Sequence, residues 1–227
     1  HNVVGILDIF FPRRCLGCGR VGKYFCNGCQ STIRAIEQNE TICPVCQKPA
    51  FGGMTHPRCK TPYAIDGLTS FFQYDGVVRN AIKLLKYRFA SDLAREFVSL
   101  ILGYSFSEFP KKFILIPIPL HPVRLRFRGF NQAELLGTLI AEKMDIPVRI
   151  DVLKRARGTK PQVEMHDKKE RLKNLNDAFS IHNSPFQIPH SVLLFDDVFT
   201  TGATMRAAAG VLKHAGVKYV WGITMAR

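Results

Sequence analysis

The sequence predicts an α/β protein in which a parallel sheet is flanked by helices and is preceded by a small zinc-ribbon module. Three observations support this prediction. All seven cysteines lie before residue 60, strand and helix patterns alternate after residue 66, and one apolar strand ends in two aspartates followed by a glycine-containing loop. A chain of 227 residues has room for one α/β domain and a small extra module. We place the zinc-ribbon module in residues 1–62 and the α/β domain in residues 63–227.

Pairs of metal-ligating side chains define the module. Three cysteine pairs are each separated by two residues, and a histidine and a cysteine form a fourth pair at the same spacing. The eight candidate ligands are Cys15, Cys18, Cys26, Cys29, Cys43, Cys46, His56 and Cys59. Two ligands at this spacing lie on one turn and converge on one tetrahedral ion. The pattern predicts two structural zinc ions with no coordination position left for water; a set of unligated thiols is the alternative.

Two pairings of these ligands are open. Sequential pairing gives one all-cysteine site and one site with three cysteines and a histidine, whereas cross-braced pairing interleaves the pairs. We favour sequential pairing because short loops close at low entropic cost. A module of this size cannot fold by burial alone, so its metals are expected to be structural. One short helix is expected over residues 30–39, between the two groups of cysteines.

The elements of the α/β domain follow from local patterns. Residues 68–74 are rich in β-forming side chains and end at an Asp-Gly turn, which predicts the first strand. Residues 77–87 carry an apolar stripe at helical spacing, so the first helix follows. The same criteria predict, in order, a helix over 90–102, a strand over 113–119, a helix over 131–144, strands over 148–153 and 192–195, a helix over 204–214 and a last strand over 219–224. This alternation implies a parallel sheet covered on both faces, with ligands bound at the carboxyl ends of its strands.

The strand over 192–195 leads into the most informative segment of the chain. Asp196 and Asp197 follow it, and a Thr-Thr-Gly-Ala-Thr loop then opens the next helix. The loop consists of Thr200, Thr201, Gly202, Ala203 and Thr204. Hydroxyls and backbone N–H groups at a helix N-terminus bind phosphate, and carboxylates accept hydrogen bonds from sugar hydroxyls or coordinate Mg²⁺. The segment therefore predicts a ribose 5-phosphate site; a buried strand followed by a capped helix is the alternative.

Three basic segments accompany this motif. Residues 120–132 carry alternating arginines that include Arg128, and guanidinium groups can hold pyrophosphate oxygens bidentately. Residues 153–179 are basic and poor in apolar side chains, which is typical of a mobile lid over an active site. A solvated charged surface is the alternative for both. Residues 83–89 end the first helix with cations, among them Lys86, which suit either a helix cap or a ligand.

The formal net charge of +14 favours a polyanionic partner such as nucleic acid, although a phosphorylated small molecule requires only local positive charge. No window contains the run of about 18 apolar residues that a membrane span needs. The first apolar stretch has its basic residues after it rather than before it, unlike a secretory signal. We therefore expect a cytoplasmic protein without a membrane span.

The motifs together resemble the ComF family. The resemblance rests on the four ligand pairs, on LKYRF, IPIPLHPVRLRFRGFNQ, RARGTKPQ and RLKNLNDAF, and on LLFDDVFTTGAT, so it covers essentially the whole chain. It implies a double zinc ribbon followed by a type I phosphoribosyltransferase fold that binds phosphoribosyl pyrophosphate (PRPP) with Mg²⁺. By this resemblance Asp196 and Asp197 contact the ribose hydroxyls, residues 200–204 hold the 5′-phosphate, and Arg128 contacts the pyrophosphate. His56 departs from the cysteine expected at its position, which changes the charge of the zinc site more than its function.

The resemblance also implies a role in natural transformation. In that role the protein takes part in DNA uptake and handles single-stranded DNA beside a ComF-type helicase. Two hypotheses follow: a PRPP-binding, phosphoribosyltransferase-like protein that acts in transformation, or an active phosphoribosyltransferase that modifies an unidentified nucleobase-like acceptor in nucleotide salvage. No catalytic residue can be assigned from the sequence, because nothing in it identifies the acceptor.

Overall fold

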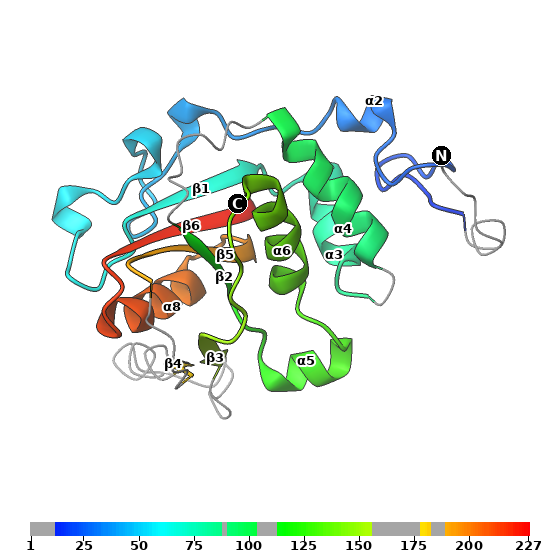
Figure 1. Cartoon of the computed structure of the whole chain (residues 1–227). Helices are drawn as coiled ribbons and strands as arrows, with labels where there is room; N and C mark the ends of the chain where they lie inside the picture. The colour runs from blue at the N-terminus through cyan, green and yellow to red at the C-terminus, as the bar shows by residue number, and fades with distance from the viewer. Residues whose placement is uncertain (1–11, 88–89, 104–112, 156–177, 183–188) are drawn as a thin grey trace, which may run out of the picture.

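A four-stranded parallel sheet forms the centre of the protein, with the strand order β1-β6-β5-β2 (Figure 1). The computed structural model describes residues 12–87, 90–103, 113–155, 178–182 and 189–227. The strands of the sheet are β1 (Gly67–Phe72), β2 (Ile114–Pro117), β5 (Ser191–Val198) and β6 (Tyr219–Ala226). A separate antiparallel pair consists of β3 (Leu153–Arg155) and β4 (Phe179–Ile181). The predicted α/β class, with a parallel sheet and an N-terminal metal-binding module, is confirmed.

Helices cover both faces of the sheet. The helices are α2 (Asn27–Gln30), α3 (Gly76–Leu84), α4 (Ala90–Ser99), α5 (Pro122–Arg128), α6 (Gln132–Met144) and α8 (Ala203–His214). Successive side chains of β5 alternate between two hydrophobic clusters: Leu193 and Phe195 pack with residues of α3, α4 and α6, and Val192 and Leu194 pack with residues of α8. Because β5 lies between two other strands and is covered on both faces, its sequence is a continuous apolar run that ends only at Asp196.

Two of the predicted elements of the α/β domain differ in the structure. Instead of a strand over 148–153, only Val148 forms a bridge to β2, and β3 begins at Leu153. Residues 120–130, for which neither a helix nor a strand was predicted, contain the short helix α5. Pro122 is favourable in its first turn, and Gly129 ends it with a φ of 81°, a left-handed conformation that glycine adopts without steric cost.

The expected helix over 30–39 is wrong. Only α2 and the 3₁₀ helix η1 (Gln38–Glu40) flank this segment, and its middle is extended beside the end of β1. The N–H group of Ile36 donates to the carbonyl of Phe71 at 2.9 Å, and the N–H group of Gln73 donates to Arg34 at 3.0 Å. Because β1 is an edge strand, its backbone groups need partners, and the module supplies them.

The zinc-ribbon module runs along the β1 edge and packs onto the α/β domain (Figure 1). Further 3₁₀ helices are η2 (Phe51–Gly53) and η3 (Pro57–Cys59) in the module and η4 (Leu100–Gly103) after α4. Phe25 belongs to the same buried cluster as Phe97 of α4, and their rings stack at 5.6 Å. At Gly53 an added Cβ would lie 2.0 Å from the carbonyl oxygen of Leu68, so only glycine fits there. The two parts therefore share one hydrophobic core.

None of the helices in the described part of the chain is long and apolar enough to cross a membrane.

Candidate functional site

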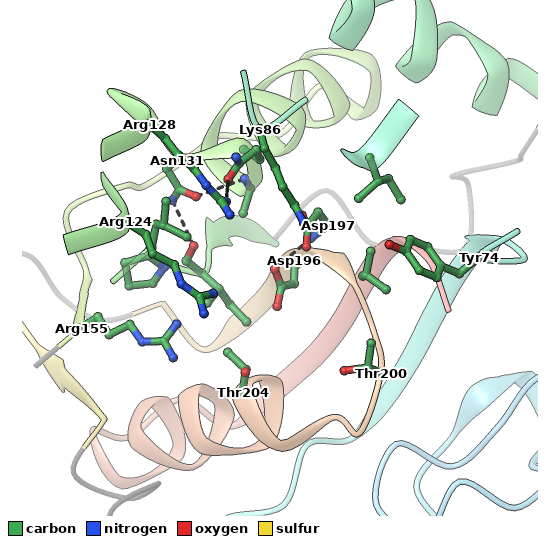
Figure 2. A pocket seen from close by; sticks show the side chains of 17 residues that line it. Tyr74, Lys86, Arg124, Arg128, Asn131, Arg155, Asp196, Asp197, Thr200 and Thr204 are labelled. Carbon is green, nitrogen blue, oxygen red and sulfur yellow. Dashed lines mark hydrogen bonds between the residues drawn. The ribbon is translucent and has the colours of Figure 1, made fainter. Parts of the chain in front are cut away.

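A cavity of about 330 Å³ opens beside the carboxyl ends of β2 and β5, where parallel sheets commonly bind ligands. We call it the central pocket. Its polar lining consists of Tyr74, Lys86, Arg124, Arg128, Asn131, Gln132, Arg155, Asp196, Asp197, Thr200 and Thr204 (Figure 2). These side chains come from segments between residues 74 and 204, so the fold gathers them. Among the residues predicted to bind PRPP, the two aspartates, Thr200, Thr204 and Arg128 all line this cavity.

The carboxylates of Asp196 and Asp197 lie at the end of β5 and face into the central pocket (Figure 2). Burial, and then the charge of Asp197, raise the pKa of Asp196 well above its usual range. Burial also raises the pKa of Asp197, although the nearby cations Lys86 and Arg128 oppose the shift. Two partly desolvated carboxylates side by side are costly, and a ligand that donates hydrogen bonds or carries a cation would relieve that cost.

Four cations line the pocket within the described residues. Lys86 follows α3, Arg124 and Arg128 lie on α5, and Arg155 ends β3. In Figure 2 these side chains converge on the same pocket as Asp196, Asp197, Thr200 and Thr204. Arg128 donates from Nη1 to Oε1 of Gln132 at 3.0 Å, which orients both side chains. The arrangement therefore places cations that can bind an anion next to a pair of carboxylates that can accept hydrogen bonds from hydroxyl groups.

Two buried donors in the pocket have no hydrogen-bond partner among the described residues: Nε2 of Gln132 and Nε of Arg155. The Gln132 residue is only 2% exposed. A buried donor without an acceptor costs about 1–3 kcal/mol, so both groups indicate a ligand rich in oxygen acceptors. Sequence reasoning missed Gln132, and it treated Arg155 only as part of the basic segment 153–179. Residues 156–177 of that predicted lid lie outside the described residues.

The loop over residues 200–204 joins β5 to α8 and encloses a second, smaller cavity of about 30 Å³. We call this segment the phosphate loop. Asp196, Thr200 and Thr204 line both cavities, so the two are continuous parts of one site. The first N–H groups of α8 have no partner within the helix, which makes this end suitable for an anion.

Gly202 shapes the phosphate loop. It precedes α8 with a φ of 69°, in the left-handed region. An added Cβ would lie 2.4 Å from the ring of Phe199 and 2.7 Å from the guanidinium of Arg206. Both the backbone conformation and the close packing therefore require glycine at this position.

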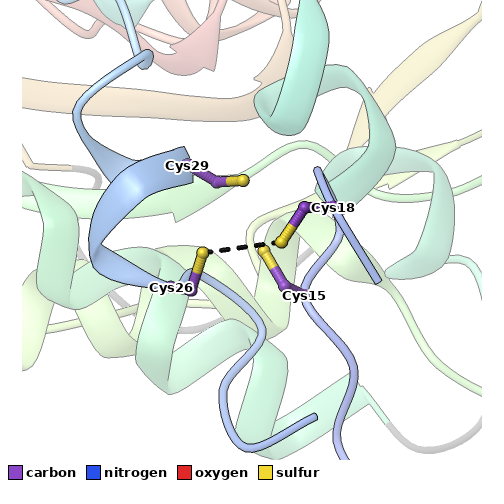
Figure 3. Close-up of side chains that lie close together, drawn as sticks. All are labelled: Cys15, Cys18, Cys26 and Cys29. Carbon is purple, nitrogen blue, oxygen red and sulfur yellow. Dashed lines mark hydrogen bonds between the residues drawn. The ribbon is translucent and has the colours of Figure 1, made fainter. Parts of the chain in front are cut away.

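The eight candidate metal ligands gather into two clusters. One contains Cys15, Cys18, Cys26 and Cys29, and the other contains Cys43, Cys46, His56 and Cys59 (Figure 3 shows the first). Within each cluster all ligand atoms lie within 4.8 Å of one another, and the ligands are grouped in sequential pairs. A tetrahedron with Zn–S bonds of about 2.3 Å has its sulfurs about 3.8 Å apart. The Sγ atoms of Cys18 and Cys26 are 3.7 Å apart, so this cluster fits a zinc ion.

The histidine of the second cluster is oriented for metal binding. Nε2 of His56 lies 3.0 Å from the carbonyl oxygen of Pro49, which can only accept, so Nε2 carries the proton. Nδ1 is then free as a ligand and lies 3.3 Å from Sγ of Cys46. A carbonyl that holds the second ring nitrogen in this way is typical of zinc-binding histidines. The two clusters are consistent with two structural zinc ions.

The electrostatics of the first cluster also favour a cation. Burial opposes ionisation of Cys15, but backbone N–H groups of Cys18, Cys26 and Gly17 outweigh it and lower the pKa of Cys15 to about 6. Hydrogen bonds with the sulfurs of Cys15 and Cys26 raise the pKa of Cys29 to about 12. The four thiols therefore cannot all ionise by themselves, and zinc binding, which needs thiolates, would supply the missing positive charge.

Comparison with known proteins supports the family resemblance seen in the sequence. Residues 6–60 match the double zinc ribbon domain family. The chain is 38% identical over 115 residues to competence protein F of Haemophilus influenzae, covering 49% of this chain and 50% of that protein. It is 28% identical over 208 residues to competence protein ComFC of Bacillus subtilis, covering 84% of this chain and 78% of the relative. For ComFC of Streptococcus pneumoniae the identity is 29% over 207 residues, covering 89% and 87%. The double zinc ribbon match and these relatives along most of the chain support the assignment to the ComF family that the sequence motifs suggest.

Proposed function

We propose that this protein binds PRPP in the central pocket and acts in DNA uptake during natural transformation. The observation that carries the proposal is the composition of one cavity. A carboxylate pair, a phosphate loop and four cations line it together. Among them lie two buried donors that have no partner in the described part of the chain. A sugar that carries phosphate groups at both ends would match all of these features at once.

Each part of the pocket corresponds to one part of PRPP. The ribose hydroxyls would donate to Asp196 and Asp197, which removes the cost of keeping two buried carboxylates ionised. The 5′-phosphate would bind at the phosphate loop, and the pyrophosphate would lie against the cations of the pocket, which include Arg128. Carboxylate oxygens suit Mg²⁺, which when bound with PRPP would neutralise part of the pyrophosphate charge.

The role in DNA uptake rests on the relatives and on charge. The three relatives are named competence proteins. A net charge of +14 exceeds what a pocket for one small anion requires, so we propose that the remaining basic surface handles single-stranded DNA beside a helicase. Because phosphate contacts release counterions, affinity for a single-stranded oligonucleotide should fall steeply as salt rises. Affinity that did not change with salt would contradict a basic DNA-binding surface.

The second candidate is an active phosphoribosyltransferase. The cations of the pocket favour it, because a group of arginines and a lysine that shares one cavity with the carboxylate pair would stabilise a leaving pyrophosphate. In that reaction the bond from the ribose C1 to pyrophosphate breaks while a bond from C1 to an acceptor forms. Pyrophosphate release on adding nucleobases would support this candidate. PRPP binding without release of pyrophosphate for any base would support a binding protein that has no transferase activity.

Calorimetry with PRPP and Mg²⁺ tests the proposal. Substituting both carboxylates (Asp196→Ala with Asp197→Ala) should abolish measurable PRPP binding, because the ribose loses its acceptors, while the zinc content stays unchanged. Asp92→Ala is a matched control, since Asp92 forms an exposed ion pair with Arg13 outside the pocket. Unchanged affinity in the double variant would refute this placement of the ribose.

A further inference from the structure

The second zinc cluster contacts the phosphate loop through two side-chain donors. Nε2 of Gln47 donates to the carbonyl oxygen of Thr201 at 2.9 Å. Nη1 of Arg206 donates to the same oxygen at 2.8 Å and to the carbonyl oxygen of Pro44 at 3.0 Å. Pro44 and Gln47 lie in the turn that carries Cys43 and Cys46, so one carbonyl of the loop is tied to the metal-binding turn from two directions.

Holding this carbonyl also determines where an N–H group of the loop points. In a trans peptide unit the C=O and N–H bonds point in opposite directions. With the carbonyl of Thr201 held toward the zinc ribbon, the N–H group of Gly202 points away from it. Gly202 and Thr201 both line the small cavity of the phosphate loop. The contacts therefore fix the orientation of an amide that an anion in this cavity would use.

The backbone of Gln47 indicates that this contact is not incidental. Gln47 has a φ of 59°, a left-handed conformation that disfavours residues with a Cβ. Gly19 occupies the equivalent position of the first cluster with a φ of 75°. In both turns the N–H group of this residue donates to the carbonyl of the first cysteine, Cys15 or Cys43, at 2.8 Å. Glycine would suit both positions, yet the second turn carries the residue whose side chain reaches Thr201.

We infer that Gln47 is a positioning residue, through which the second zinc cluster holds the phosphate loop in its anion-binding conformation. The zinc ion would make the turn rigid, and Gln47 and the Pro44–Arg206 contact would transmit that rigidity to Thr201. This inference rests on the proposed function, since it assumes that residues 200–204 bind the 5′-phosphate. When only part of a population has the competent loop conformation, the apparent affinity falls by the same fraction.

Gln47→Gly is the decisive variant, because it removes the donor and relieves the backbone at once. A purely structural role predicts that affinity follows stability. The positioning role predicts that resistance to unfolding by urea is unchanged or higher while PRPP affinity falls about five-fold, the loss expected for one hydrogen bond. Gln47→Glu, which keeps the shape but has no N–H donor, should lose about ten-fold or more, because its charge also repels phosphate.

Two controls separate positioning from general damage. Affinity for ribose 5-phosphate should fall with PRPP affinity, whereas affinity for pyrophosphate, which does not use the loop, should stay the same. Gly19→Gln introduces the same backbone strain in the first turn, where an added Cβ meets no atom within 4 Å. It should lower stability and leave PRPP affinity unchanged.

Hydrogen exchange gives a test without any ligand. The amide of Gly202 should exchange faster in Gln47→Gly than in the wild-type protein, because the carbonyl of its peptide unit loses one of its two side-chain donors and is held by Arg206 alone. Equal exchange, or equal PRPP affinity in wild-type and Gln47→Gly proteins, would overturn the positioning role and leave the proposed function intact. If the wild-type protein itself failed to bind PRPP, both proposals would fall.

Discussion

The two zinc clusters have the same spacing within their ligand pairs but different neighbours. Beside the first, an added Cβ at Gly17 would lie 2.9 Å from a methyl group of Val77 on α3, and Phe25 stacks on Phe97 of α4. The second cluster meets the phosphate loop through Gln47. The first therefore lies against helices on one face of the sheet, and the second contacts the candidate site. One metal-binding motif, repeated, thus contributes to two separate properties of the protein.

Removing one zinc ligand from each cluster should show this difference most strongly. Structural zinc contributes about 10 kcal/mol or more to the folding of isolated ribbons, so Cys15→Ser and Cys43→Ser should each lose one metal ion and much of the stability of their ribbon. In Cys43→Ser the PRPP affinity should also fall, about ten-fold or more, because the loop loses its support. Metal analysis and calorimetry on the folded fraction would measure both effects. Equal losses of affinity in the two variants would contradict separate roles.

Two glycine substitutions test the same difference in the backbone, one in the phosphate loop and one in the turn of the first zinc cluster. Gly202→Ala should destabilise the protein by about 1–3 kcal/mol, because the left-handed backbone and the close contact with Phe199 both oppose a Cβ. PRPP affinity should fall with it. Gly19→Ala has the same backbone problem in open space and should cost only about 1 kcal/mol, with PRPP affinity unchanged. Urea denaturation and calorimetry would be used for both, and a loss of binding in Gly19→Ala would argue against the assignment.

Asp196→Asn should change PRPP affinity and stability in opposite directions. Its expected effect on stability is the smallest among these variants. The folded protein raises the pKa of Asp196, so its stability falls as pH rises from the unfolded value of about 3.9 through the folded value. At neutral pH the variant does not have to bury an ionised carboxylate at this position. We therefore expect the Asp196→Asn protein to be more stable than the wild type by about 1 kcal/mol while binding PRPP far more weakly. The gain should disappear below about pH 4, where Asp196 is protonated in both states. Thermal unfolding across pH would measure it; a gain that grew as pH fell would contradict the raised pKa.

Much of the fold could be predicted because its signals are local. The apolar run before Asp196 predicts a strand buried on both faces, and the stripe over 77–87 predicts the helix α3. The cysteine spacing predicts two four-ligand clusters, since paired ligands on one turn converge without help from distant residues. The predicted helix over 30–39 was wrong because a contact with a distant segment, rather than a local pattern, decides its structure. Its helical pattern was local, but the unpaired edge of β1 offered its backbone better partners.

The candidate site could be predicted only in part. Asp196, Asp197 and the phosphate loop form one continuous motif, so the sequence suffices to propose them. Gln132, Lys86 and Arg155 carry no such signal, because each lies on a different element and reaches the pocket only after the sheet is assembled. Their charge and hydrogen-bonding capacity were visible in the sequence, whereas their convergence was not.

Properties that depend on neighbouring residues follow from the sequence alone: strand and helix periodicity, metal-ligand spacing and the phosphate-loop motif. Which distant groups come into contact depends on how the elements pack. Gln47 and Thr201 are separated by 154 positions, and their hydrogen bond exists because the module folds back along the β1 edge toward the start of α8. No local preference encodes such a contact. It depends on packing two independently patterned segments, and in this protein that packing places a zinc-binding turn against the phosphate loop.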